Sequence, residues 1–393
     1  MRKTYQVIGL MSGSSLDGVD IAFCLFDIEK KNQDIVVHDW SLQVAETIAF
    51  PERWYNRLYN LPTQSALTFA KTHTYFGHFL GECVLDFIKN HQVEPDFIAS
   101  HGHTIFHEPQ NRVTIQIGDG SAMAATTGYT VINNFRNQDI AIDGEGAPVA
   151  PIVDKYLLGG HDFYLNIGGI ANISCRLPDK LVAFDICPAN QLLNALANQI
   201  QLEYDEGGQV AAKGTTDDTL LSALNQATFY QQPYPKSLDN EWVIKNLLSS
   251  IENNPERIPD QLRTSVEHIA FQIAQSIRQI VQQENLSKSN YTLFPTGGGV
   301  FNTFLMERMS EHCSHLGVQV IIPEPPIIQF KEAILMAWMG VMRMEEVPNI
   351  MRTVTGAQRD TVGGAVHFAL GLKNQKSKII HHKSTQDASR MDL

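Results

Sequence analysis

Two short apolar runs with a polar turn between them open the chain. Residues 5–11 and 19–26 are mainly apolar, and the polar stretch Ser-Gly-Ser-Ser occupies residues 12–15. Both runs are too short for helices and too apolar for edge strands. We therefore expect a hairpin buried within a sheet that is covered on both faces.

The same arrangement returns near the middle of the chain. Residues 163–167 lead into Gly168 and Gly169, residues 170–175 lead out, and residues 181–186 follow a Pro-Asp-Lys turn as a third apolar run. These features predict three consecutive strands. Two glycine-turned hairpins in one chain indicate two related halves.

A third glycine turn has different surroundings. Apolar residues 291–295 precede Thr-Gly-Gly-Gly at residues 296–299, and residues 300–309 then continue with helical spacing. This pattern predicts a strand, a glycine turn and a helix.

Longer amphipathic stretches predict helices over residues 65–91 and 264–284. In the second stretch, Thr264 and Glu267 have the spacing of a capping box, which predicts that the helix starts there. Residues 371–393 contain too little apolar surface to offset the entropy of ordering, so we expect a disordered tail.

Composition excludes several classes of partner. The 393 residues are 43% hydrophobic and 18% charged, as in a folded protein of two or three domains. The net charge of -12 would repel nucleic acid and anionic membranes. The five cysteines form no C-x-x-C pair, and no signal peptide or long apolar run is found. We expect a soluble, cytoplasmic protein that binds neither nucleic acid nor membrane.

The glycine turns are candidates for phosphate binding. Without a Cβ atom, a glycine lets a phosphate approach the backbone and meet several N–H donors. The sequence contains neither G-x-x-x-x-G-K-[ST] nor G-x-G-x-x-G, so P-loop and Rossmann sites have no support. The turns are therefore either ordinary hairpin connections or the phosphate-binding elements of another nucleotide site.

Four acidic residues are candidates for catalysis. Asp17 and Asp20 belong to the first hairpin, Asp185 ends the strand that begins at residue 181, and Glu332 follows the third glycine turn in the chain. A single aspartate most often caps a turn. Asp185 stands where an apolar strand gives way to a helix expected at residues 191–200, so it is either a cap or a general base.

Histidines suggest a rival site. His101 and His103 follow the apolar strand 97–99, and His107 comes four residues later. A zinc hydrolase needs three ligands and an open position, and no further metal motif is present. The same histidines would also suit contact with a polar substrate or a purely structural loop. Cys187 is either a nucleophile or a small packed side chain.

Taken together, the motifs resemble the anhydro-N-acetylmuramic acid kinase family. The opening Gly9-Leu-Met-Ser-Gly-Ser-Ser-Leu-Asp-Gly-Val-Asp20 is its most specific motif. The similarity spans residues 8–368 and continues in Ser100-His-Gly-His-Thr104, Gln116-Ile-Gly-Asp119, Phe135-Arg136, Gly146-Ala-Pro148, Leu165-Asn-Ile-Gly-Gly-Ile-Ala-Asn172, Gly297-Gly-Gly-Val-Phe-Asn302, Glu332-Ala333 and Thr355-Gly-Ala357.

This resemblance implies an α/β fold of the actin, hexokinase and Hsp70 superfamily. Such a fold is two-lobed and ribonuclease H-like, with the active site in the interlobe cleft. The lobes implied here are residues 1–137, with 355–370 packing back onto them, and residues 138–354. A homodimer is the oligomeric state that we consider for this chain.

The resemblance also implies a reaction and its cofactors. The family uses ATP and Mg²⁺ to open the 1,6-anhydro ring of anhydro-N-acetylmuramic acid with water and to phosphorylate O6, giving N-acetylmuramic acid 6-phosphate for cell-wall recycling. Asp185 matches the catalytic base and Glu332 a second acidic position. No metal bound directly by protein side chains is expected.

Binding residues follow from the same motif matches. The ATP-binding residues would be Gly13, Ser14, Ser15, Leu16, Asp17, Gly18, Val19 and Asp20 in the first turn, Gly168 and Gly169 in the second, and Gly297, Gly298, Gly299 and Asn302 beside adenosine. The sugar-binding residues would be His101, His103, Thr104, Asp119, Arg136 and Asn172.

Some residues depart from the family pattern. The family usually has Thr-Gly-Pro-Gly-Asn after Asp185, whereas Cys187 and Ala189 replace the two glycines here, and residues 103, 143 and 145 also differ. These changes leave two further readings open. One is a kinase of another anhydro or amino sugar, and the second is a nucleotide-binding homologue without catalysis.

Overall fold

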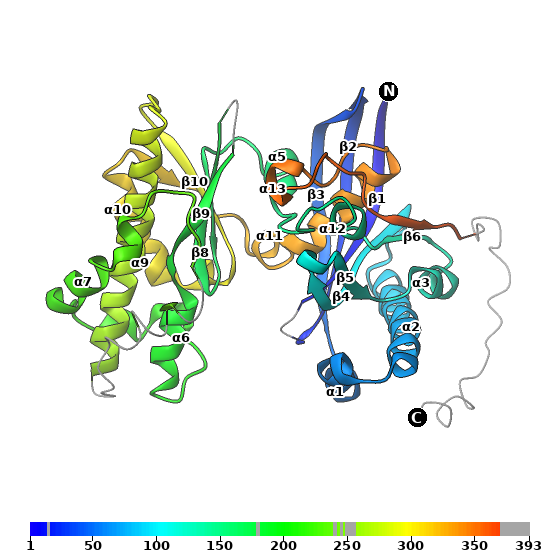
Figure 1. Ribbon diagram of the computed structural model, residues 1–393, viewed down its shortest axis with the longest axis horizontal. Helices are drawn as coiled ribbons and strands as arrows, with labels where there is room; N and C mark the ends of the chain where they lie inside the picture. The colour runs from blue at the N-terminus through cyan, green and yellow to red at the C-terminus, as the bar shows by residue number, and fades with distance from the viewer. Residues whose placement is uncertain (14–15, 178–180, 239–241, 244–246, 248–256, 370–393) are drawn as a thin grey trace. The chain divides into compact units, whose positions relative to one another are not determined.

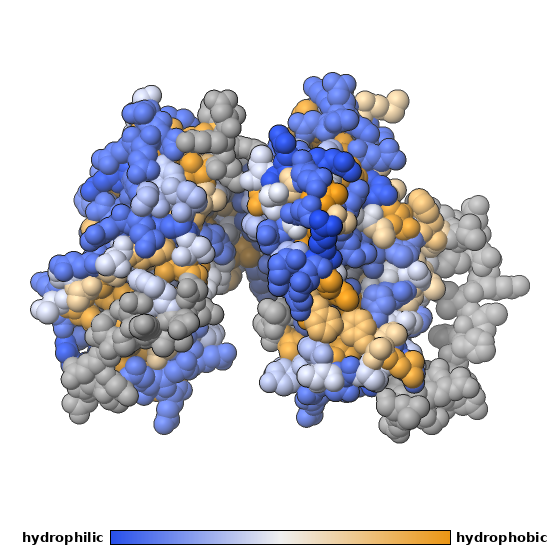
Figure 2. Space-filling view, in the orientation of Figure 1, coloured by the Kyte–Doolittle hydropathy of each residue, from blue (hydrophilic) through white to orange (hydrophobic). Residues whose placement is uncertain are grey.

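The chain divides into two compact units, which are described separately. The computed structural model describes residues 1–13, 16–177, 181–238, 242–243, 247 and 257–369 (Figure 1). Unit 1 consists of Met1–Val149 and the chain from Glu332 onward, and unit 2 of Ala150–Lys331. The visible surface of both units is largely hydrophilic (Figure 2), and no described helix is both long and apolar enough to span a bilayer.

Unit 1 is built on a mixed sheet with the strand order β12-β6-β4-β1-β2-β3, to which β5 adds by pairing with β4. Strands β1, β2 and β3 are antiparallel, β4 and β6 continue the sheet in parallel with β1, and β12 closes it antiparallel to β6. Their bounds are β1 Arg2–Ser12, β2 Gly18–Lys31, β3 Asp34–Ala49, β4 Phe97–Glu108, β5 Val113–Ile117, β6 Thr130–Asn133 and β12 Ala365–His367.

The helices of unit 1 are α1 Glu52–Asn60, α2 Ala66–His91, α3 Gly120–Thr127, α4 Asn137–Ile140, α12 Lys331–Met344 and α13 Arg352–Thr355. Helix α2 begins after Ser65, whose hydroxyl accepts a hydrogen bond from the Thr68 amide. A Cβ atom added to Gly9 would lie 1.9 Å from the Ala333 carbonyl oxygen, so α12 packs directly on the backbone of β1.

Unit 2 repeats the topology of unit 1. Its sheet has the order β11-β10-β7-β8-β9, with three antiparallel strands followed by two parallel ones. The bounds are β7 Phe163–Ile167, β8 Ile170–Arg176, β9 Leu181–Pro188, β10 Tyr291–Thr296 and β11 Val318–Val320. This repetition confirms the expectation of two related halves and the actin- and hexokinase-like α/β fold class.

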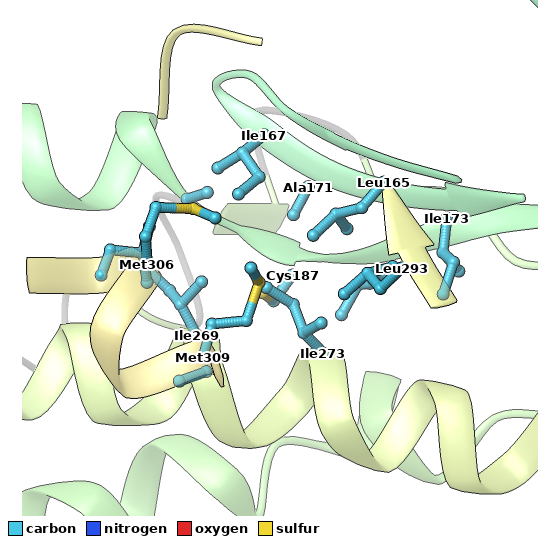
Figure 3. Packing of buried hydrophobic residues seen from close by; sticks show 14 of the residues in the cluster. Leu165, Ile167, Ala171, Ile173, Cys187, Ile269, Ile273, Leu293, Met306 and Met309 are labelled. Atoms are coloured by element: carbon cyan, nitrogen blue, oxygen red, sulfur yellow. The ribbon is translucent and has the colours of Figure 1, made fainter. Parts of the chain in front are cut away.

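The helices of unit 2 include α5 Pro151–Tyr156, α6 Asn190–Asn198, α7 Asp218–Asn225, α9 Ile258–Gln283, α10 Thr303–Ser314 and α11 Pro325–Gln329. Helices α9 and α10 run side by side (Figure 1). Leu165 and Ile173 from the sheet pack with Ile269 and Ile273 from α9, which makes one apolar core (Figure 3).

The division of the chain differs from the expected limits of 137/138 and 354/355. Residues 332–344 of α12 fall in the range given to the second lobe but belong to unit 1. Gly9 and Gly340 let α12 approach the strands of unit 1, and a Cβ on Gly340 would lie 2.7 Å from Cβ of Ala99. The C-terminal segment does return to unit 1, because β12 pairs with β6. The expected tail at 371–393 lies outside the described residues.

Two local predictions need correction. Helix α9 begins at Ile258, with Pro259 in its first turn, and Thr264 lies inside it, where the hydroxyl donates to the Asp260 carbonyl. The capping box at Thr264 was therefore wrong. The strand expected at 97–99 extends to Glu108, so His101 and His103 lie within β4 and not in a loop after it.

Candidate active site

The first glycine turn connects β1 to β2. Leu16 has a left-handed conformation, with φ of 61°, and its amide lies 3.4 Å from the Gly13 carbonyl oxygen. The packing of β2 against β3 requires a glycine at position 18, because a Cβ there would lie 2.4 Å from the Ile48 carbonyl oxygen. Val19 is fully buried, and Ser14 and Ser15 lie outside the described residues.

An acidic side chain at the start of β2 is tied to β3. Asp20 accepts a hydrogen bond of 2.6 Å from the Thr47 hydroxyl. Burial raises the pKa of Asp20, the Thr47 hydrogen bond opposes that rise, and the neighbouring charge of Asp17 adds to it. The first turn therefore carries two carboxylates close enough to influence each other.

A buried histidine contacts the residue at which the first turn begins. His103 Nδ1 lies 2.9 Å from Ser12 Oγ, and both side chains are at most 5% exposed. Burial lowers the pKa of His103 to about 4, so the imidazole is neutral near pH 7. His103 thus links β4 to Ser12, the residue at which the glycine turn begins, and helps to position that turn. A contact between His103 and the sugar remains a prediction.

The structure brings Arg136 within electrostatic range of both His101 and Glu332. Burial and, to a smaller extent, the nearby Arg136 charge lower the pKa of His101 to about 3. Burial also lowers the pKa of Arg136, an effect that the Glu332 charge opposes. Arg136 immediately precedes α4, and Glu332 lies in the first turn of α12.

Asp119, another predicted sugar contact, caps a helix. Its carboxylate accepts a hydrogen bond of 2.6 Å from the Ala122 amide at the start of α3 and lies 3.5 Å from His73 Nε2. Asp119 and His73 line a cavity of about 230 Å³ in unit 1, together with residues that include Asn133 and His367. Thr104 Oγ1 is 3.4 Å from the side-chain amide of Gln116.

In unit 2, two glycine turns meet the beginning of α6. The carbonyl groups of Gly168 and Gly169 accept hydrogen bonds from the amides of Asn190, Ala189 and Gln191. A Cβ on Gly299 would lie 2.2 Å from Ile167 Cγ2 and 3.1 Å from Asn190 Oδ1. The two turns for which ATP binding is predicted in this unit are therefore neighbours in the structure.

Asp185 lies near the end of β9, opposite Asn172 of β8. Its Oδ2 atom accepts hydrogen bonds from the Leu238 amide at 2.9 Å and the Ser237 hydroxyl at 3.2 Å. No described group donates to Oδ1. One carboxylate oxygen is thus held in place while the other can accept a proton, which is an arrangement suited to a general base.

The two side chains that replace family glycines point into the core. Cys187 and Ala189 are fully buried, and Figure 3 shows Cys187 among apolar residues that include Ile269 and Met309. Burial raises the pKa of the Cys187 thiol far above its usual range, which disfavours a nucleophilic role.

Asn302 caps helix α10. The neighbouring pair Gly207 and Gly208 was not among the residues predicted from the sequence. The Asn302 side chain accepts a 2.9 Å hydrogen bond from the Leu305 amide at the start of α10. A Cβ on Gly208 would lie 2.3 Å from Asn302 Oδ1, and Thr303 Oγ1 donates to the Gly207 carbonyl. The Gly-Gly doublet was the signal that could have revealed this contact.

A fully buried carboxylate was also missed. Asp139 accepts hydrogen bonds of 2.9 Å from the Gly146 amide and the Thr355 hydroxyl. These bonds fasten the segment between α4 and α5 to α13. The family motif at Thr355 therefore supplies a hydrogen bond to Asp139. Asp139 stands alone in the sequence, so no motif indicated this contact.

The zinc-hydrolase hypothesis receives no support. His103 bonds with Ser12, His107 Nδ1 lies 3.1 Å from Thr114 Oγ1, and His101 Nδ1 faces the Gly102 carbonyl. In the part of the chain that the structure describes, no three histidine, cysteine, aspartate or glutamate side chains are placed to hold a metal ion.

Two sheets of one topology, each with a glycine turn at its central hairpin, place the chain in the actin- and hexokinase-like class. Residues 5–369 match the profile of the anhydro-N-acetylmuramic acid kinase family. The chain belongs to this family, which confirms the resemblance found in the sequence.

Individual relatives match over most of their length. Anhydro-N-acetylmuramic acid kinase of Coxiella burnetii (strain RSA 493 / Nine Mile phase I) is 34% identical, over 92% of this chain and 97% of the relative. The protein of the same name from Pasteurella multocida (strain Pm70) is 31% identical, over 93% and 97%. A solved structure, the activator of 2-hydroxyisocaproyl-CoA dehydratase from Clostridium difficile with bound ADPNP, is similar with a TM-score of 0.34 and 14% identity, over 88% and 97%.

Proposed function

We propose that this protein is an ATP-dependent kinase that opens the 1,6-anhydro ring of anhydro-N-acetylmuramic acid with water and phosphorylates O6. The observation that carries this proposal is the family match, which runs through residues 5–369 and includes Asp185. The product would be N-acetylmuramic acid 6-phosphate. A cytoplasmic role in cell-wall recycling is part of the proposal, since that compartment supplies ATP.

In the proposed reaction, Asp185 removes a proton from water. The water oxygen forms a bond to the anomeric carbon, and the bond from that carbon to the bridging oxygen breaks. The released oxygen then attacks the γ-phosphorus of ATP, and ADP leaves. The hydrogen bonds from Leu238 and Ser237 fix one Asp185 oxygen, so the other can accept the proton. General-base assistance of this kind contributes roughly 10² to 10⁴ in rate.

The glycine turns at 13–20 and 168–169 would bind the phosphates of ATP, and the turn at 297–302 would lie beside the adenosine. Gly168 lies beside the start of α6, and Gly297 has φ of 88°, a backbone conformation that suits glycine. Mg²⁺ bound to ATP would neutralise phosphate charge. Asp17, Asp20 and Glu332 fit such an ion because carboxylates accept hydrogen bonds from its water ligands.

The proposal is tested by measuring sugar-dependent ATP turnover for the wild type and Asp185→Asn. We expect kcat to fall by ~10²-fold or more, because asparagine cannot accept the proton. Asp218→Asn is the matched control, since Asp218 is an exposed acid of the same unit, and it should keep kcat within about twofold. Near-normal turnover by Asp185→Asn would remove Asp185 from this role.

A second candidate function is that of a kinase acting on another anhydro or amino sugar. His103, Asp143 and Glu145 differ from the family pattern, and all three are in unit 1. Turnover with a panel of anhydro and amino sugars distinguishes a kinase of another sugar from the proposed enzyme. ATP binding without turnover on any acceptor would instead indicate a nucleotide-binding homologue.

A further inference from the structure

Residues 229–238 of unit 2 form a strap along the end of β9 at which Asp185 lies. The Asp185 amide donates a hydrogen bond of 3.0 Å to the Lys236 carbonyl. The Ser237 hydroxyl and the Leu238 amide both donate to the Asp185 carboxylate, and no other group in the described part of the chain does so. Three consecutive residues of the strap therefore set where this carboxylate lies.

The Lys236 side chain fastens the strap to β9. Its half-buried ammonium group donates a hydrogen bond of 3.3 Å to the Phe229 carbonyl. The same group lies 4.6 Å from the centre of the Phe229 ring and 5.9 Å from that of Phe184, the residue before Asp185. A cation over an aromatic face is attracted by the ring, more strongly where water is excluded. Lys236 thus ties both ends of the strap together next to Asp185.

Two tyrosines hold the strap on the body of unit 2 without help from Lys236. The Tyr234 ring stacks on Phe184 with a centroid distance of 4.9 Å, and its hydroxyl donates to Glu284 at 2.8 Å. The Tyr230 hydroxyl lies 2.9 Å from Nε2 of His268 in α9. Because these contacts remain when Lys236 is replaced, we expect such a variant to keep its fold and to change only the last residues of the strap.

The position of Asp185 matters because a general base must direct a lone pair at the proton that it removes. The Asp185 carboxylate is only partly buried, so packing alone does not select one rotamer. A displacement of a reacting group by about 1 Å can cost roughly 10²-fold in rate. The donors of the strap are therefore placed to affect the rate without touching the substrate.

We propose that Ser237 and Lys236 are positioning residues for Asp185. Ser237 acts through its hydrogen bond to the carboxylate, and Lys236 acts through the strap that carries Ser237 and Leu238. This inference rests on the proposed function and adds what orients the base. Neither side chain takes up the proton, so their replacement should lower kcat and leave the KM values nearly unchanged.

The first test measures sugar-dependent ATP turnover of Ser237→Ala and Lys236→Met. We expect kcat to fall by ~10-fold in each variant, while KM for ATP and for the sugar stays within about twofold. Ser237→Thr keeps the hydroxyl and should retain kcat within about threefold, and Lys236→Arg should recover part of the loss because it keeps a cation over the rings. Ser237 is exposed, so its variants test the inference even if Lys236→Met fails to fold.

The matched controls are Ser287→Ala and Lys213→Met, at exposed positions of the same unit. Both should keep the kcat of the wild type. Wild-type kcat in Ser237→Ala or in folded Lys236→Met would overturn the inference. A raised KM with unchanged kcat would overturn it as well, since these side chains would then serve binding.

The second test asks whether both residues act through Asp185. Adding Ser237→Ala or Lys236→Met to Asp185→Asn should lower kcat by less than about twofold further, because the group that they position no longer acts as a base. A further loss as large as in the wild-type background would overturn the inference. Failure of the proposed function shows itself differently, as an absence of sugar-dependent ATP turnover in the wild type.

Discussion

At the scale of single residues, side-chain direction decides what a sequence change means. Cys187 and Ala189 replace glycines of the family pattern, but both side chains point into the apolar core of unit 2. The substitutions therefore leave the turn beside Asp185 without bulky groups. These two positions were the reason to consider a nucleotide-binding homologue without catalysis. Because both side chains are buried in the core, the substitutions no longer favour that hypothesis.

Buried neutral histidines make stability depend on pH. Burial lowers the pKa of His268 to about 3, while an unfolded chain has a histidine pKa of about 6.5. Between these values the unfolded chain binds a proton that the folded protein excludes, so the free energy of unfolding rises with pH and falls as the pH drops below about 6.5. His101 and His103 act in the same direction.

We therefore predict that the urea midpoint of unfolding decreases from pH 7.5 to pH 5. His268 is hydrogen-bonded to Tyr230 and Asn225, and His268→Gln should show a smaller decrease than the wild type. His315→Gln, at an exposed position, should behave like the wild type. A midpoint that does not change between these pH values would contradict the prediction.

At the scale of elements, local patterns predicted the strands better than the helix ends. The hairpins β1–β2 and β7–β8 were found because short apolar runs and glycine turns are local signals. The start of α9 was placed too late, because Thr264 mimics a cap although its hydroxyl is buried against the preceding turn. The use of α12 by unit 1 depends on a contact with β1, far away in the sequence, which periodicity does not encode.

That contact gives a prediction about Gly9. The chain passes so close to α12 that a methyl group at Gly9 would overlap the Ala333 carbonyl. Gly9→Ala should lower the free energy of unfolding by about 2 kcal/mol or more, because backbone on both sides must move. Gly159→Ala, whose added methyl would lie 3.4 Å from the nearest carbonyl oxygen, should change stability by less than about 0.5 kcal/mol.

Chemical denaturation of both glycine variants measures the difference. Equal stabilities would show that α12 can shift without cost, and the interpretation of Gly9 would then be wrong. The sequence alone could indicate that Gly9 belongs to the opening motif of the family. The packing reason for a glycine at this position required the position of α12.

At the scale of the whole molecule, the site was anticipated less completely than the fold. Motif matches pointed to Asp185, Arg136 and the glycine turns. The carboxylate of Asp139 and the contact of Gly207–Gly208 with Asn302 went unnoticed, because their partners come from distant parts of the chain. Buried hydrogen bonds of this kind leave no periodic trace in a sequence.

The continuity of unit 2 leads to a prediction about fragments. Residues 150–331 contain a complete sheet and their own apolar core. This fragment should fold alone and unfold in one cooperative transition, which circular dichroism in urea can follow. Residues 1–149 alone lack α12 and β12 and should not do so. A fragment 150–331 without a cooperative transition would show that its core is insufficient.

The same connectivity sets an order of events at the ribosome. Strand β1 is translated before unit 2, yet the helix that covers Gly9 follows only after all of unit 2 has been made. At typical elongation rates the synthesis of unit 2, Ala150–Lys331, alone lasts roughly 10 to 40 s. The nascent first half must spend that time with apolar strand surface uncovered, so it is the stage at which a chaperone would be most useful to this chain.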